Sequence, residues 1–266
     1  MIDKLEESIS SLIGTSLSEI RINKSSKEMS ILFDYIISKM SPLIGNLVEL
    51  KICSHLDEGM PELSQWVRQD PDFPDVVSSI NPEIGVEVKV WYPFSTEITG
   101  RFKESQSYLQ GKEMYLAIFA WDFEPVQNCH DEGEWLSPFI LDGSLIPCQE
   151  IAASRDMHYH KPPRYLVVEP LDTTARTRNL QQRNVEGYRL QADEGNAKKI
   201  MNDLGMEETY SMSDDYQDKI QRLQSSCRYR LDTNFAKLDR IRNDGIESFK
   251  SRVINTLNLR QAATAD

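Results

Sequence analysis

The sequence lacks the features that mark several large classes of protein. The chain of 266 residues contains no run of about 18 uncharged apolar residues, which excludes a transmembrane helix. Its first residues, Met1 to Glu7, carry acids where a signal peptide carries bases, and no apolar segment follows them. The 4 cysteines are scattered without a Cys-x-x-Cys pair, which is typical of thiols in a reducing compartment. We therefore expect a cytoplasmic protein without a membrane partner.

Basic residues are also scarce. Lysine and arginine number 30 against 42 aspartates and glutamates, which gives a formal net charge of −12. This balance disfavours a histone-like coat on nucleic acid, but it is compatible with an enzyme that gathers carboxylates around a metal ion. With 39% hydrophobic and 27% charged residues, the composition is that of a globular protein with a substantial core.

The spacing of apolar residues predicts an α/β protein. Residues 30–56 show helical spacing that Pro42 and Gly45 interrupt, so two helices and one kinked helix are both possible. Further helices are expected at 101–112 and, as a long amphipathic stripe, at 213–259. Extended runs alternate with these helices, at 74–77, 84–91, 114–121 and 164–169. The segment 122–161 mixes proline, glycine and acids and is expected to be irregular.

Asp75, Glu87 and Lys89 form the pattern that carries the clearest chemistry. If 74–77 and 84–91 form a hairpin, Asp75 begins one strand while Glu87 and Lys89 share a face of the next. Two carboxylates on adjacent strand ends can hold a hard divalent cation through oxygen ligands. A lysine beside them can position or help deprotonate a water, or meet the charge that develops on a phosphate. Together these groups suffice for hydrolysis of a phosphodiester by a water attacking in line.

The context of these residues separates them from chance repeats of the same letters. The chain contains two Pro-Asp pairs and two Glu-x-Lys patterns, at Pro71-Asp72, Pro74-Asp75, Glu49-Leu50-Lys51 and Glu87-Val88-Lys89. Only the second Pro-Asp pair runs directly into β-branched residues, and only the second Glu-x-Lys lies in an alternating strand. Asp72 remains an alternative to Asp75. An ordinary half-exposed strand with a Glu/Lys pair is the plain alternative to a site.

Pro74-Asp75, eleven intervening residues and Glu87-Val88-Lys89 resemble the active-site motif of the PD-(D/E)XK nucleases, which include many type II restriction endonucleases. The resemblance spans residues 45–102. It implies a restriction-endonuclease-like core, in which helices flank a mixed central sheet, here with a helical C-terminal part. It also implies that Asp75, Glu87 and the backbone carbonyl of Val88 bind Mg²⁺, while Lys89 contacts the attacking water.

Glu49 is similar to a further element of that superfamily, a glutamate on a helix that precedes the motif. In this role Glu49 would bind a second ion or orient a water. A solvated helix residue without a role is an equal alternative, because glutamate is usually exposed.

Two stretches outside the motif carry candidate DNA contacts. Thr96 and Arg101 follow the Glu-x-Lys strand and could contact phosphates, although an aromatic cluster followed by a helix N-cap is the alternative. Residues 173–184 contain no carboxylate and many donors of the kind that read guanine and adenine edges or bind phosphates. The candidates in this stretch are Arg176, Arg178, Gln182 and Arg183. A solvated loop that leads into a helix explains the stretch equally well.

These expectations combine into a Mg²⁺-dependent endonuclease that cleaves double-stranded DNA at a specific sequence. A two-fold homodimer would supply the two sites that symmetric cleavage of a duplex needs. The chain would then be a single nuclease domain with its catalytic core at 30–125, DNA-recognition loops and a strand at 126–212 and a helical part at 213–260. The alternatives are a structure-specific repair or recombination nuclease of the same superfamily and a non-catalytic acidic interaction protein.

Overall fold

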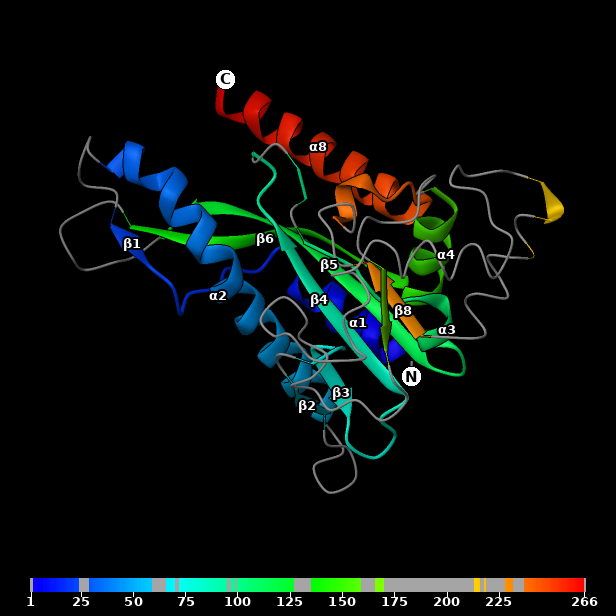
Figure 1. Ribbon diagram of the computed structural model, residues 1–266. Coiled ribbons are helices and arrows are strands. Elements are labelled where there is room, and N and C mark those ends of the chain that lie inside the picture. Colours follow the sequence, from blue (N-terminus) through cyan, green and yellow to red (C-terminus); the bar gives the residue numbers. More distant parts are fainter. Residues whose placement is uncertain are drawn as a thin grey trace. The chain divides into compact units, whose positions relative to one another are not determined.

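The architecture is that of a computed structural model (Figure 1). It describes residues 2–23, 29–58, 66–69, 72–94, 97–98, 100–126, 135–158, 166–169, 213–215, 218, 228–231 and 237–265. The chain divides into two compact units. One unit comprises Met1–Gly100, Met114–Ile146 and Asp244–Asp266, and the other comprises Arg101–Glu113 and Pro147–Asn243.

The first unit is built on a six-stranded sheet with the strand order β1-β6-β5-β4-β3-β2. Its strands are β1 (Ile22–Asn23), β2 (Trp66–Arg68), β3 (Val76–Ser78), β4 (Ile84–Trp91), β5 (Glu113–Pro125) and β6 (Trp135–Pro147). Its helices are α1 (Ile2–Leu12), α2 (Met29–Asp57) and α8 (Asp244–Ala265). The structure is therefore mixed α/β with a central sheet flanked by helices, as the sequence predicts.

The predicted hairpin is present. β3 and β4 pair antiparallel, with Val76 opposite Val86 and Val77 opposite Gly85. β2 adds to the other side of β3, and Arg68 lies opposite Val76 there. The strands β2, β3 and β4, which lie close together in the sequence, thus build one edge of the sheet. This edge carries the motif residues Asp75, Glu87 and Lys89.

The other elements of the predicted core are also confirmed. Of the two alternatives for residues 30–56, the structure has one continuous helix, α2, which contains Pro42. On β4 the side chains of Val86 and Val88 are buried, as the alternation predicts. β5 is buried from Met114 to Trp121, which is the pattern of a strand covered on both faces.

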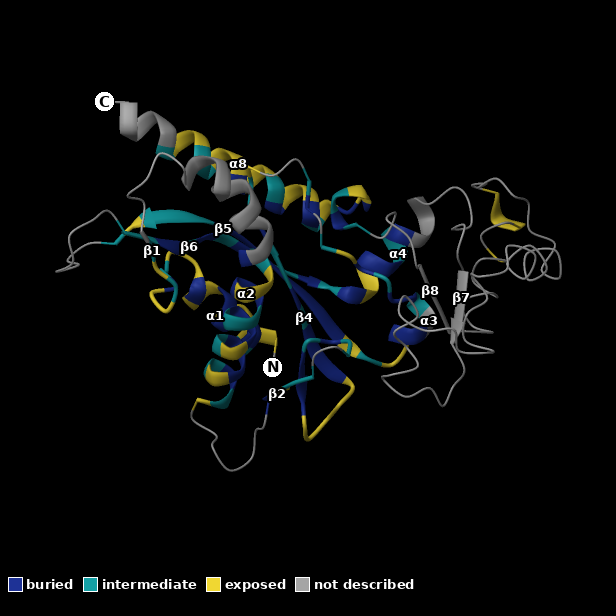
Figure 2. Ribbon diagram, turned by 60° about the vertical axis from the view of Figure 1, so that its left-hand side comes forward, coloured by how far each residue is buried: buried dark blue, intermediate teal, exposed yellow. Residues whose placement is uncertain are grey.

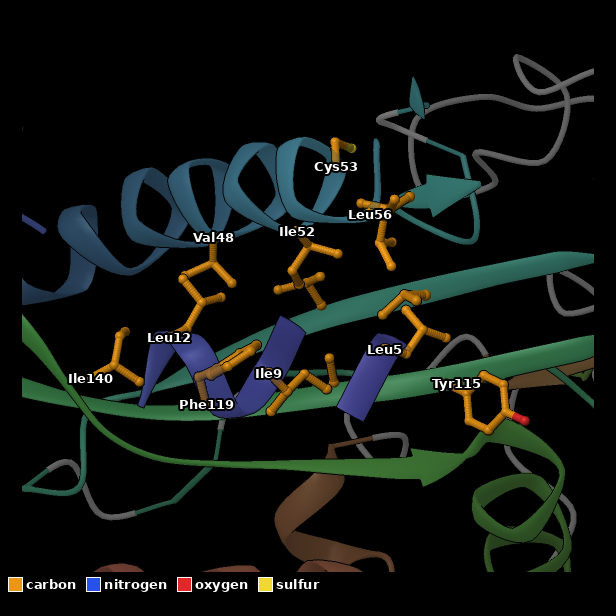
Figure 3. Packing of buried hydrophobic residues seen from close by; sticks show 14 of the residues in the cluster. Leu5, Ile9, Leu12, Val48, Ile52, Cys53, Leu56, Tyr115, Phe119 and Ile140 are labelled. Carbon is orange, nitrogen blue, oxygen red and sulfur yellow. The ribbon is translucent and has the colours of Figure 1, made fainter. Parts of the chain in front are cut away.

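A hydrophobic cluster fills the space between α1, α2 and one face of the sheet (Figure 3). Figure 3 shows Val48 and Ile52 of α2 extending toward α1, where Ile9 lies beside Phe119 of β5. α1 buries one side and exposes the other, so it covers the sheet as an amphipathic helix (Figure 2). This packing fixes α2, and with it any functional side chain on α2, against the sheet.

α8 covers the opposite face. Because side chains alternate along β4, Trp91 faces away from Val88, and its ring centroid lies 6.2 Å from that of Phe249 in α8. Arg252 of α8 also pairs with Asp142 of β6, with 3.0 Å between Nε and Oδ2. Within the first unit the sheet is therefore covered by helices on both faces.

The second unit has its own elements. These are α3 (Gln106–Leu109), α4 (Cys148–His158), β7 (Leu166–Glu169), β8 (Arg228–Leu231) and the 3₁₀ helix η4 (Leu238–Arg240). β7 and β8 pair antiparallel as a separate two-stranded sheet. The strand predicted at 164–169 therefore exists, but it belongs to this small sheet.

The predicted helix at 101–112 is too long. Only α3 forms, because the side chain of Ser105 accepts the Tyr108 N–H as an N-cap and Gly111 adopts a positive φ of 78° just after the helix.

The irregular structure predicted for 122–161 is also wrong, since β6 and α4 occupy much of it. Pro138 lies inside β6 and has no N–H to donate, while its carbonyl accepts a hydrogen bond from the Leu17 N–H at 2.7 Å.

The continuous helix predicted over 213–259 is wrong at 228–231. These residues form β8, whose partner β7 lies far away in the sequence. The helical C-terminal part is confirmed for α8, which begins at Asp244. In the part of the chain that the structure describes, no helix combines the length and the apolar character needed to cross a bilayer.

Candidate active site

Asp75 is held at the start of β3 by main-chain pairing. Its carbonyl accepts the Gln69 N–H at 3.0 Å, which extends the β2–β3 ladder by one step. The register of β3 and β4, continued one step beyond Val76 and Val86, places Asp75 opposite Glu87. The two carboxylates therefore share the end of the hairpin, as the sequence predicts.

Gly85 and Pro74 fix the path of the chain into this position. An ideal Cβ on Gly85 would lie 2.3 Å from Pro74 Cγ and 2.8 Å from the carbonyl oxygen of Val76. Only glycine fits so close an approach. The contact keeps the residue before Asp75 tight against β4.

Both main-chain polar groups of Val88 are bound by side chains of the motif. The N–H of Val88 donates to Asp75 Oδ2 at 2.8 Å, and its carbonyl accepts from Lys89 Nζ at 3.0 Å. β4 continues beyond the end of its ladder with β3, so Val88 lies past the last paired residue of β3. The side chains of Asp75 and Lys89 take the place of that strand.

The Lys89 ammonium lies where three oxygen atoms converge. Its Nζ is 3.2 Å from Asp75 Oδ2, 2.5 Å from Glu87 Oε1 and 3.0 Å from the carbonyl oxygen of Val88. All three side chains are mostly buried, with 12–20% of their surface exposed. Burial alone lowers the pKa of Lys89, but the carboxylates of Glu87 and Asp75 outweigh it and raise that pKa above its usual value. Lys89 is therefore held as a cation.

The stem of Lys89 is restrained as well. A Cβ built on Gly100 would lie 3.1 Å from Lys89 Cδ and 3.4 Å from its Cβ and Cγ. The backbone at Gly100 therefore packs directly on the lysine stem and limits its rotamers.

Glu49 reaches the same region from α2. It is buried, and burial and the nearby Asp75 carboxylate raise its pKa, while Arg68 and Lys89 act in the opposite direction. Arg68 Nε donates to Glu49 Oε2 at 2.5 Å, and Arg68 Nη2 donates to Asn46 Oδ1 at 2.8 Å. Glu49 is thus within electrostatic range of the motif and is not a solvated surface residue.

The structure brings together five of the predicted positions, namely Asp75, Glu87, Val88, Lys89 and Glu49. Of the two candidate aspartates, Asp75 contacts the lysine, whereas the described contact of Asp72 is a main-chain N–H donated to Gln69.

Of the predicted DNA contacts, the structure describes Arg101. Arg101 is exposed and belongs to the second unit, where its backbone forms a bridge with Lys237. The remaining candidates, Thr96, Arg176, Arg178, Gln182 and Arg183, lie outside the described residues.

Sequence reasoning missed Arg68 and Asn46. Asn46 stands three residues before Glu49, so a shared helix face was a readable signal. Arg68 offered no such signal, since β2 has only three residues and its contact with Glu49 spans 19 positions.

The donor set fits a hard divalent cation. Carboxylate and carbonyl oxygens are the ligands of Mg²⁺, and here three of them already surround one cationic atom. Among the described residues, no group of three or more His, Cys, Asp or Glu side chains is arranged to hold a metal ion. The arrangement around Lys89 instead offers two carboxylates and one main-chain carbonyl.

Comparison of the chain with protein-family models, with curated proteins and with solved structures finds no match.

Proposed function

We propose that this protein is a Mg²⁺-dependent endonuclease that cleaves double-stranded DNA, similar to the type II restriction enzymes. The observation that carries the proposal is the convergence of Asp75 Oδ2, Glu87 Oε1 and the Val88 carbonyl around Lys89 Nζ. A Glu/Lys pair on an ordinary exposed strand does not need an aspartate from the neighbouring strand, nor burial of all three side chains. A nuclease of the PD-(D/E)XK class needs both.

In this proposal the residues have distinct roles. Asp75, Glu87 and the Val88 carbonyl would hold Mg²⁺, which would supply Lewis-acid stabilisation and make a water more acidic. Lys89, held as a cation, donates hydrogen bonds, so it orients the attacking water and meets charge on the phosphate. The water oxygen forms a bond to phosphorus as the opposite P–O bond breaks. The attacking water gives up one proton to solvent, and the departing oxygen takes one proton from solvent. Glu49 orients a water or binds a second ion.

The proposal also includes recognition of a specific DNA sequence and symmetric cleavage of the two strands. Residues 173–184 supply base readout, and a two-fold homodimer supplies one active site for each strand of the duplex. A restriction-endonuclease-like core is the architecture that this function implies for the first unit.

The test is digestion of unmethylated phage DNA by the purified full-length protein, with Mg²⁺ and with EDTA. Lys89→Ala is the inactive variant. Lys51→Ala is the matched control, because Lys51 belongs to the other Glu-x-Lys pattern and pairs with Glu19 on the surface of the same unit. Discrete Mg²⁺-dependent fragments with wild type and Lys51→Ala, and none with Lys89→Ala, support the proposal.

Two other outcomes contradict parts of it. A smear that depends on Mg²⁺ and Lys89 contradicts sequence specificity and leaves a nuclease that acts on structure or without preference. No cleavage, together with no Mg²⁺-dependent rise in melting temperature, contradicts the nuclease itself, because an ion bound to the native site must stabilise the fold.

A further inference from the structure

Arg68 connects two residues of α2 to the candidate active site. Its Nε donates to Glu49 Oε2 at 2.5 Å and its Nη2 donates to Asn46 Oδ1 at 2.8 Å. The Glu49 side chain is only 9% exposed and that of Arg68 is 27% exposed. Because the guanidinium is planar and both partners are fixed on one helix, these contacts restrain the direction of the Glu49 carboxylate and not only its distance.

The fold places this arginine beside the motif. Arg68 lies opposite Val76 in the β2–β3 ladder, and the next hydrogen bond of that ladder joins the Gln69 N–H to the Asp75 carbonyl. The main-chain pairing that fixes Asp75 therefore also fixes Arg68. Its two partners on α2 are three residues apart and share one face of the helix.

Arg68 also acts on Glu49 electrostatically. Burial and the neighbouring Asp75 raise the pKa of Glu49, and the hydrogen bond and charge of Arg68 oppose this shift. Arg68 therefore favours the ionised carboxylate in a place where burial disfavours it. Since Arg68 binds Oε2 of Glu49, we expect Oε1 to be the oxygen that binds an ion or a water.

We propose that Arg68 is a positioning residue that acts through Glu49: it holds Oε2, directs Oε1 and thereby raises the affinity of the site for Mg²⁺. The inference rests on the proposed function, because it requires a divalent ion near Glu49. It goes beyond that function by assigning to β2 a part in metal binding.

The test is calorimetric titration of Mg²⁺ into the full-length protein without DNA. The variants are Arg68→Gln, Glu49→Gln and the double variant. Loss of a group that orients a metal ligand typically weakens affinity by about 10–100-fold, and we expect this of Arg68→Gln. In the Glu49→Gln background the same change should have no further effect, because the residue that transmits it is already altered.

Two more variants separate positioning from charge and from stability. Arg68→Lys keeps the charge but cannot bridge Glu49 and Asn46, so we expect an intermediate affinity. Arg252→Gln is the matched control, since Arg252 pairs with Asp142 elsewhere in the same unit and its loss should leave Mg²⁺ affinity unchanged. Near-ultraviolet circular dichroism confirms that each variant is folded.

The outcomes are distinguishable. Wild-type Mg²⁺ affinity in a folded Arg68→Gln variant overturns the inference, even if its melting temperature falls. A loss that is equally large with and without Glu49 overturns the route through Glu49. A wild-type protein that binds no Mg²⁺ overturns the metal site, and the proposed function fails with it.

Discussion

Replacement of Lys89 by methionine gives the sharpest test of the candidate active site. Lys89 Nζ lies where three oxygens converge, so a divalent ion that uses these oxygens must displace the ammonium. Methionine removes the charge and keeps an unbranched stem, which matters because Gly100 packs directly on that stem. Lys89→Met should therefore leave the packing intact and leave two carboxylates without their cation.

The cost of this change follows from the geometry. At the 3.2 Å between Nζ and Asp75 Oδ2, Coulomb's law gives about 1 kcal/mol in water and about 5 kcal/mol at an effective dielectric constant of about 20. Removal of one partner from a buried ion pair costs about 3–5 kcal/mol, and residual exposure favours the lower end, about 3 kcal/mol. For a protein of this size that corresponds to a fall in melting temperature of about 6–12 °C in EDTA.

Mg²⁺ should reverse most of this loss. An ion at about 100 times its dissociation constant stabilises the native state by about 2.7 kcal/mol. In the wild type, the ion must displace the Lys89 ammonium, which offsets part of that gain. In Lys89→Met, the oxygens of Asp75, Glu87 and the Val88 carbonyl can bind the ion without this displacement. We expect a larger Mg²⁺-dependent rise in melting temperature for Lys89→Met than for wild type, and an affinity at least about tenfold higher, or about 1.4 kcal/mol. Cleavage should nevertheless be lost.

The assay is thermal unfolding of both proteins across a Mg²⁺ titration, with EDTA as the starting point. Lys51→Met is the control, because the Lys51–Glu19 pair has side chains 34% and 47% exposed and such pairs contribute about 0–1 kcal/mol. An EDTA melting temperature equal to wild type, or a Mg²⁺ response no larger than wild type, would refute the placement of Lys89 at the ion-binding point.

Three further predictions concern neighbouring residues. Asp75→Asn should abolish cleavage while the fold and DNA binding persist, and retained cleavage in a digestion assay would transfer the role to Asp72. Gly85→Ala should cost about 1–3 kcal/mol in denaturant unfolding because its Cβ would overlap Pro74, whereas Gly45→Ala, with no atom nearer than 3.9 Å, should stabilise α2 by about 1 kcal/mol. Burial raises the pKa of Cys53 to about 11, so Cys53 should remain a protonated thiol at pH 8. It should therefore react slowly with iodoacetamide until urea unfolds the protein. Rapid labelling of the native protein, followed by mass spectrometry, would contradict the burial of Cys53.

The hairpin and its motif could be predicted because their determinants are local. Alternation with period two identifies the buried face of β4, and a short turn fixes the register that sets Asp75 opposite Glu87. Contact between Asp75 and Lys89 then follows from strand geometry alone. The same locality explains why the Pro74-Asp75 pair was the better candidate.

The other parts of the fold and of the candidate site could not be predicted, because they depend on contacts between residues that are distant in the sequence. Arg68 meets Asn46 across 22 positions, and only the packing of α2 against β2 creates that contact. β8 lies in a stretch whose apolar spacing fits a helix, and it forms a strand because it pairs antiparallel with β7. Proline and glycine made β6 resemble a loop, but the carbonyl of Pro138 is satisfied by the N-terminal segment at Leu17.

Asp75 has a structural task in addition to the proposed chemical one. β4 extends past its pairing with β3, and the N–H of Val88 would be buried without an acceptor if Asp75 Oδ2 were absent. Asp75→Ala therefore removes a main-chain acceptor and a candidate ligand at once, and loss of activity in that variant has two explanations. Asp75→Asn retains an oxygen for the Val88 N–H, while it replaces the other oxygen by an NH₂ group and removes the charge that pairs with Lys89. If a folded Asp75→Asn variant loses Mg²⁺ binding, the chemical role of Asp75 is separated from its structural one.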